Sequence, residues 1–169
     1  MKTKVILILA AFFFTNLTFA QINKGNWFVS GNSTLQVSSS KVEGSSSSTT
    51  TVFFSPSFGY FVIDGLSVGV SANILNSDGS TVYAFLPTAS YYFQTQGSVK
   101  PFVEVGIGYG KISVDEESTG GLSFGGGAGI TYFINQNVGL NIGLQYLRGD
   151  YDGAVNNTFG GAIGFSIFF

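Results

Sequence analysis

The last eleven residues, FGGAIGFSIFF (Phe159–Phe169), alternate in character up to the end of the chain. Successive side chains of an extended strand point to opposite sides, so one face carries Phe159, Ile163, Phe165, Ile167 and Phe169. The opposite face carries Gly160, Ala162, Gly164 and Ser166, which are small or polar, and neither face carries a charge. This stretch therefore indicates a strand that separates an apolar surrounding from a narrow polar interior.

The same period of two recurs along the chain. We expect strands over residues 26–38, 49–62, 66–76, 81–93, 101–112, 121–133, 137–147 and 158–169. Each segment is long enough to cross a bilayer, which takes about 9–11 tilted residues. An even number of strands lets the last strand close against the first, which removes the open edges of the sheet. The sequence predicts an all-β fold, an eight-stranded antiparallel up-and-down transmembrane β-barrel.

The two faces of each expected strand differ consistently. The fifth strand places Val103, Val105, Ile107 and Tyr109 opposite Glu104 and three glycines. A water-soluble, lipocalin-like barrel is the nearest alternative, but it would carry charged side chains on its outer face. The small and polar face here is almost uncharged, so we assign it to the interior of a membrane barrel.

Aromatic residues of the apolar face fall near the strand ends. Near the end that holds both chain termini they are Trp27, Tyr60, Tyr91, Phe93, Tyr132 and Phe169. Near the other end they include Tyr83, Tyr109, Tyr146 and Phe159. Two aromatic girdles around an aliphatic band are typical of the two interfaces of a bilayer.

The connections between the expected strands alternate in length. Residues 63–65, 94–100 and 134–136 read as short turns, whereas 39–48, 77–80, 113–120 and 148–157 are mostly longer and rich in Ser, Gly and Asp. Outer-membrane barrels have short periplasmic turns and longer outer loops. We therefore expect both chain termini on the periplasmic side.

The amino terminus has the pattern of a secretory signal peptide. Lys2 and Lys4 precede an apolar run that is too short for a transmembrane helix, and small residues lead up to Ala20. We expect cleavage between Ala20 and Gln21, with residues 1–20 as signal peptide and 21–169 as one barrel domain. An uncleaved anchor is the alternative.

Composition narrows the chemistry of this domain. The chain has no Cys, which excludes disulfides and thiolate metal sites. Without the two signal-peptide lysines, five basic residues stand against nine acidic ones, a net charge of −4. No basic patch for nucleic acid can be assembled from so few cations, so we expect no nucleic-acid partner.

Two stretches resemble a known family. SPSFGYFVIDGLSVGVSAN (Ser55–Asn73) and KPFVEVGIGYG (Lys100–Gly110) are similar to the hairpin motifs of small Gram-negative outer membrane beta-barrel domain proteins, the OmpA/OmpX-like eight-stranded barrels. The resemblance implies the bacterial outer membrane as location, with its lipid and lipopolysaccharide as surroundings. It also implies that Phe169 belongs to a terminal signal read by the barrel-assembly machinery. It implies no particular activity, because the family hosts several.

Catalysis is not expected. Barrel enzymes that this chain resembles in architecture depend on histidine, and this chain has none, so the usual neutral-pH base is missing. Asp64 occupies a turn, and only Glu104 points inward. The other seven acidic residues fall in expected loops, namely Glu43, Asp78, Asp115, Glu116, Glu117, Asp150 and Asp152. No inward pair of carboxylates remains to replace the missing base.

Glu104 is the candidate polar group of the lumen. One interpretation makes it a site for protons or small solutes. The other, which we favour, makes it a structural group that accepts hydrogen bonds from Ser, Thr, Tyr92 or Asn141, helped by Lys100. The glycine runs Gly106–Gly110 and Gly125–Gly129 lack the helix of a phosphate loop and instead relieve crowding inside a narrow barrel.

The sequence thus favours an outer-membrane barrel with a structural or surface-interaction role, without catalysis, metal or cofactor. A narrow porin-like channel for ions or very small solutes is the alternative. Acidic loop tips such as 115–117 could hold a divalent cation, although solvated tips fit their spacing better. What the loops bind is not encoded in any motif.

Overall fold

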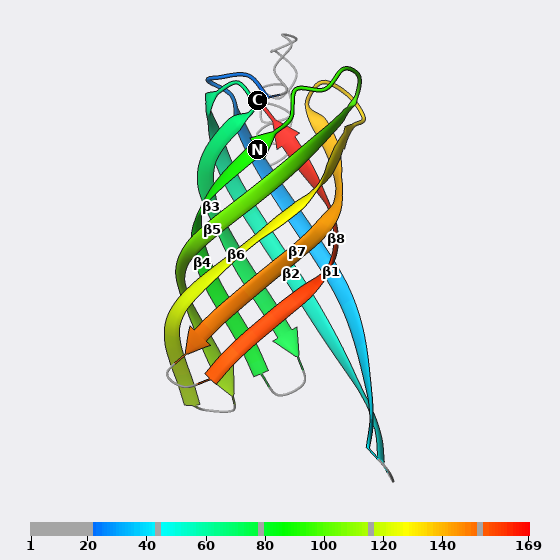
Figure 1. Cartoon of the computed structure of the whole chain (residues 1–169), viewed down its shortest axis with the longest axis vertical. Coiled ribbons are helices and arrows are strands. Elements are labelled where there is room, and N and C mark those ends of the chain that lie inside the picture. The colour runs from blue at the N-terminus through cyan, green and yellow to red at the C-terminus, as the bar shows by residue number, and fades with distance from the viewer. Residues whose placement is uncertain (1–21, 43–44, 78–79, 115–116, 152–153) are drawn as a thin grey trace, which may run out of the picture.

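The computed structural model describes residues 22–42, 45–77, 80–114, 117–151 and 154–169. Its strands are β1 Trp27–Val42, β2 Ser45–Ile63, β3 Leu66–Ser77, β4 Ser80–Tyr92, β5 Val99–Val114, β6 Glu117–Phe133, β7 Val138–Tyr151 and β8 Ala154–Phe168. Each strand pairs antiparallel with the next, and β8 pairs with β1, so the sheet is a closed barrel (Figure 1). The predicted fold class is confirmed. Among the described residues, no helix is long and apolar enough to cross a membrane.

The strands are strongly inclined to the barrel axis. Across the closing seam, Trp27 and Phe169 exchange two backbone hydrogen bonds of 2.7 and 2.9 Å. Following the pairing from Trp27 through all eight strands leads instead to Phe159, ten residues earlier on β8. An offset of ten residues in eight strands corresponds to a tilt of about 40°. The odd-numbered strands β1, β3, β5 and β7 run away from the end that holds Trp27 and Phe169, and the even-numbered strands run back toward it.

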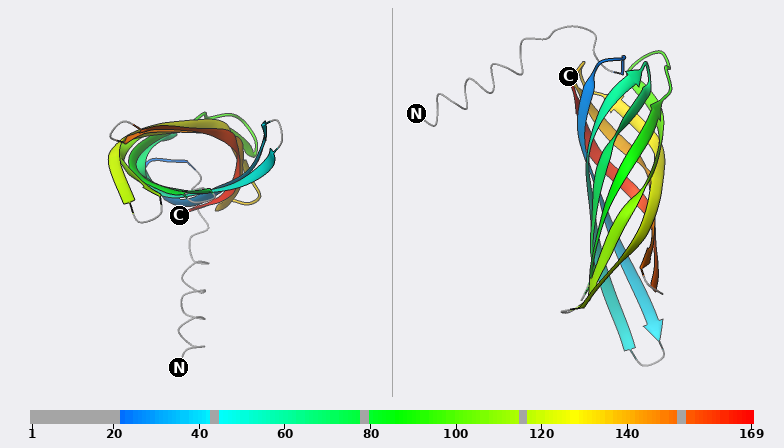
Figure 2. Two further views of the ribbon diagram at one scale, coloured as in Figure 1. Left: turned by 90° about the horizontal axis from the view of Figure 1, so that it is seen from below. Right: turned by 90° about the vertical axis from the view of Figure 1, so that its left-hand side faces the viewer.

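We call the end that holds Trp27 and Phe169 the terminal rim and the opposite end the distal rim. Seen along its axis, the barrel is oval (Figure 2). The hairpin of β1 and β2 reaches further beyond the distal rim than the other hairpins do (Figures 1 and 2).

The outward faces carry the expected apolar residues. Val103, Val105 and Ile107 are exposed on the outer surface, as are Ile142 and Leu144 on β7. The expected girdle residues near both rims also point outward, and most of them are well exposed. The inside–outside assignment is confirmed.

The prediction that the connections at the distal rim are mostly longer than those at the terminal rim is wrong. At the distal rim the strands continue to Val42, Ser77, Val114 and Tyr151 and resume only three residues later each time. The connections at the terminal rim, residues 64–65, 93–98 and 134–137, are as long or longer. Ser-, Gly- and Asp-rich segments lack an apolar pattern, yet antiparallel pairing satisfies their backbone groups as well as those of any other residues. Glu117 and Asp150, which we expected in loops, accordingly lie in β6 and β7.

Candidate functional site

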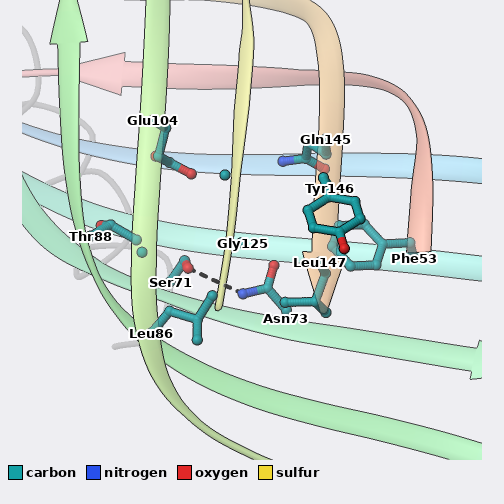
Figure 3. Close-up of a pocket in the computed structure, with 12 residues that line it drawn as sticks. Phe53, Ser71, Asn73, Leu86, Thr88, Glu104, Gly125, Gln145, Tyr146 and Leu147 are labelled. Atoms are coloured by element: carbon teal, nitrogen blue, oxygen red, sulfur yellow. Dashed lines mark hydrogen bonds between the residues drawn. The ribbon is translucent and has the colours of Figure 1, made fainter. Parts of the chain in front are cut away.

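The barrel interior is the candidate site because it contains Glu104. This residue is on β5, and its carboxylate Oε2 accepts a hydrogen bond of 2.8 Å from Ser90 Oγ on the neighbouring β4. The carboxylate borders a cavity of about 20 Å³ (Figure 3). A cavity needs about 10–15 Å³ to hold one water molecule, so this space is the size of a single water site.

Glycines form part of the cavity wall. Gly106 and Gly125 line the cavity, together with Ser71, Asn73 and Gln145. A Cβ atom on Gly125 would lie 2.6 Å from the backbone oxygen of Tyr146, so no larger residue fits there without a shift of the backbone. Both glycine runs belong to strands, which fits a role in relieving crowding.

One polar atom beside the cavity has no protein partner. Gln145 Oε1 is buried, and no hydrogen bond satisfies it within the described part of the chain. Gln145 projects from β7 into the same space as Glu104, which projects from β5 (Figure 3). One water molecule in this cavity would give the amide oxygen a donor.

The groups expected to bind Glu104 are mostly engaged elsewhere. Asn141 bonds to Thr131, Ser166 and Asn32, and the Lys100 ammonium donates to the backbone oxygen of Thr95 near the terminal rim. The serine that we expected is Ser90. The geometry therefore places Glu104 in a small local network rather than in a charged cluster.

An aromatic cluster fills the lumen toward the terminal rim. It consists of Ile22, Phe28, Phe61, Tyr92, Phe133 and Phe168, with Phe102 packed against it. The rings are in contact, with centroids 4.9 Å apart for Phe133 and Phe168 and 5.6 Å apart for Phe28 and Phe61. The chain preceding β1 holds Ile22 in this cluster, because Gly65 N donates to Ile22 O and Lys24 N to Asp64 Oδ1.

A second apolar cluster lies toward the distal rim. It contains Phe53, Leu75, Val82, Ala84, Leu86, Leu147 and Tyr151. Tyr151 is fully buried, and its hydroxyl lies 3.1 Å from Ser123 Oγ. The prediction of an inward face that is small and polar throughout is wrong at these two clusters.

The other predicted site residues are spread over the molecule. Ala20 and Gln21 lie outside the described residues, as do Glu43, Asp78, Asp115, Glu116 and Asp152. Phe169 points outward at the terminal rim and pairs with Trp27 through its backbone. Within the described ranges, no group of three or more acidic side chains is placed to hold a metal ion.

The fold is shared with known outer-membrane barrels. Neisserial surface protein A has 21% sequence identity and a TM-score of 0.61, covering 86% of this chain and 96% of that one. The N-terminal barrel domain of Pseudomonas aeruginosa OprF has 16% identity and a TM-score of 0.63, covering 86% and 98%. The attachment invasion locus protein Ail of Yersinia pestis has 19% identity and a TM-score of 0.50, covering 86% and 99%.

A comparison with curated proteins gives no significant match. The family model described as outer membrane protein beta-barrel domain matches residues 5–166, almost the entire chain. This match agrees with the closed barrel, its apolar outer face and its aromatic girdles. The chain belongs to the outer membrane protein beta-barrel domain family and is a protein of the bacterial outer membrane.

Proposed function

We propose that this protein is a closed, non-catalytic barrel whose role is structural or lies in the hairpins that it presents beyond the distal rim. The observation that carries this proposal is the filled lumen. Apolar clusters occupy the interior toward both rims, and the polar layer between them contains a cavity of about 20 Å³ beside Glu104. A conducting pore needs a continuous water path, and the interior of an eight-stranded barrel is usually filled by side chains.

The hairpins are the parts best placed to meet other molecules. Beyond Ser33 and Ile163, the described ladder between β1 and β8 ends, and β1 continues with β2 alone as a two-stranded ribbon. With the terminal rim on the periplasmic side, this ribbon extends away from the cell. Its residues between 38 and 51 are mostly Ser and Thr, so their composition suits contact with water or polar partners.

Catalysis has no support in the interior. The residues lining the cavity include one acid, Glu104, and the chain contains no histidine to act as a base with it. A carboxylate bonded to Ser90 fits a structural role, since buried polar groups are normally hydrogen-bonded.

Planar-bilayer recording on refolded protein tests the closed lumen. We expect no unitary conductance steps from the wild type. A porin inserted in the same bilayer is the positive control, because its steps show that the recording can detect a channel. Reproducible steps would favour the channel alternative. The variant Glu104→Gln would then locate the path, because a change in cation selectivity would place it through the lumen.

A further inference from the structure

Two strands of the barrel carry the same short pattern at the same place. Tyr109-Gly110-Lys111 on β5 and Tyr146-Leu147-Arg148 on β7 each put a tyrosine and a cation on the outward face, two residues apart. Both strands run toward the distal rim, so each cation lies just beyond the tyrosine of the distal girdle. These two cations are a large share of the five in residues 21–169.

The pairing of β5 and β7 with β6 shows that the two cations lie at a similar height. Lys111 is opposite Gly120 and Arg148 is opposite Phe124, four residues further along β6. Because the strands are tilted, more than half of this four-residue offset is cancelled along the barrel axis. The Cα atoms of Lys111 and Arg148 are therefore about 4 Å apart along that axis. Their Cα atoms are then about 16 Å apart along the surface, given two strand spacings and four residues of rise.

The hydroxyl groups of Tyr109 and Tyr146 lie beside the residues that pair with the two cations. A Cβ atom on Gly120 would lie 2.0 Å from the Tyr109 hydroxyl, so this hydroxyl rests against the residue paired with Lys111. The Tyr146 hydroxyl donates to Asn157 Oδ1 at 2.9 Å, and Asn157 is the residue paired with Arg148. Tyr109 is 65% exposed, and Lys111 and Asn157 are exposed as well. The surface thus presents two cations and hydroxyl and amide groups above a band of apolar side chains.

We infer that this surface, formed by Tyr109, Lys111, Tyr146, Arg148 and Asn157, binds the phosphorylated headgroup of lipopolysaccharide. Cations just outside the apolar band meet the level at which the headgroups of the outer leaflet begin. Phosphates attached to a sugar headgroup match separated cations flanked by hydrogen-bonding groups. Leu122 and Phe124 lie exposed between the two tyrosines and supply contact for acyl chains. The inference rests on the proposed orientation, in which the distal rim faces outward.

Asp150 modifies this surface. It is exposed on the outward side of β7, two residues beyond Arg148, and its negative charge offsets part of the positive charge of Lys111 and Arg148. Removal of its charge should strengthen the attraction to phosphate. This variant should therefore raise the affinity for the lipid, whereas removal of the two cations should lower it.

The test measures binding of purified lipid A, with both phosphates and after enzymatic dephosphorylation, to protein refolded in an uncharged detergent. The double variant Lys111→Gln, Arg148→Gln should bind the phosphorylated lipid about 25-fold more weakly, about fivefold for each cation. It should bind the dephosphorylated lipid as the wild type does. The variant Asp150→Asn should bind the phosphorylated lipid more tightly.

Lys24→Gln is the control, because Lys24 is exposed at the terminal rim and its replacement removes one positive charge, as each of the two substitutions in the double variant does. We expect it to leave binding unchanged. Equal weakening by this variant and by the double variant would overturn the inference, as would equal affinity of the wild type for both lipids. Displacement of the lipid by inorganic phosphate at millimolar concentration would also overturn it, because the surface would then hold a free ion.

The same preparations should be recorded in planar bilayers. If they are silent but show no preference for phosphorylated lipid, the inference fails and the closed barrel stands. If they conduct, the proposed closed lumen fails whatever the lipid result.

Discussion

Asn141 joins four strands of the barrel through one side-chain amide. Its oxygen accepts from Thr131 Oγ1 at 2.8 Å, and its nitrogen donates to Ser166 Oγ at 2.8 Å and Asn32 Oδ1 at 3.2 Å. These partners come from β6, β8 and β1, so the amide lies across the closing seam. The side chain is only 4% exposed. Replacing it removes the bonds while its partners Thr131 and Ser166 stay buried.

We predict that Asn141→Leu lowers the free energy of unfolding by about 1–3 kcal/mol, the usual cost of leaving buried hydrogen-bonding groups unsatisfied. Urea titration of protein refolded in lipid vesicles measures this change. Gln145→Met is the control, because it alters an inward amide of the same strand whose oxygen already lacks a partner. A loss for Gln145→Met as large as that for Asn141→Leu would contradict the importance of the hydrogen bonds across the seam.

Phe168 is the last residue of β8, and Phe169, which follows it, has different surroundings. Phe168 is 0% exposed, and its ring contacts those of Phe28, Phe61, Tyr92 and Phe133. Phe169 points outward, and its backbone forms two hydrogen bonds with Trp27 at the end of the seam. The stability of the barrel should therefore depend on Phe168, and delivery to the membrane on Phe169.

We predict that Phe168→Ala destabilises the refolded barrel by about 3–5 kcal/mol, as is usual when a buried aromatic ring is removed. Deletion of Phe169 should still permit refolding in detergent but should lower the amount that reaches the outer membrane in cells. Denaturant titration and quantification of outer-membrane fractions give the two results. A truncated protein that reaches the membrane at the wild-type level would refute the assembly signal, and one that fails to refold would make Phe169 structural.

The strands and their faces could be predicted from the sequence because lipid on one side imposes a simple period of two. The aromatic cluster at the terminal rim was not predicted, although the sequence contains a signal for it. Aromatic doublets stand near five strand ends, as Trp27–Phe28, Tyr60–Phe61, Tyr91–Tyr92, Tyr132–Phe133 and Phe168–Phe169. Neighbouring residues of a strand point to opposite sides, so each doublet supplies one ring to the girdle and one to the lumen.

The partners of Glu104 could be predicted only by residue type. Which strand supplies the nearest donor depends on the register between strands, and Ser90 faces Glu104 because β4 and β5 pair at that position. The length of the distal hairpins was also hidden, because polar strands without a buried face carry little sequence signal for their pairing.

At the scale of the whole molecule, the apolar band between the two girdles fixes how the barrel sits in the bilayer. Ile142 is exposed on β7 between Leu140, which pairs with the girdle residue Tyr132, and Tyr146 of the distal girdle. Val155 is exposed on β8 beyond Phe159 of the distal girdle. An arginine costs about 2–4 kcal/mol at the bilayer midplane and about 0–1 kcal/mol near an interface. We therefore predict that Ile142→Arg loses about 2–4 kcal/mol and Val155→Arg at most about 1 kcal/mol in vesicle refolding experiments. Both substitutions replace an exposed aliphatic side chain with the same cation, so they differ mainly in depth. In detergent micelles, which adapt to the protein, the difference should shrink. Equal losses at the two positions in vesicles would mean that the band between the girdles is not the part of the surface that lipid covers.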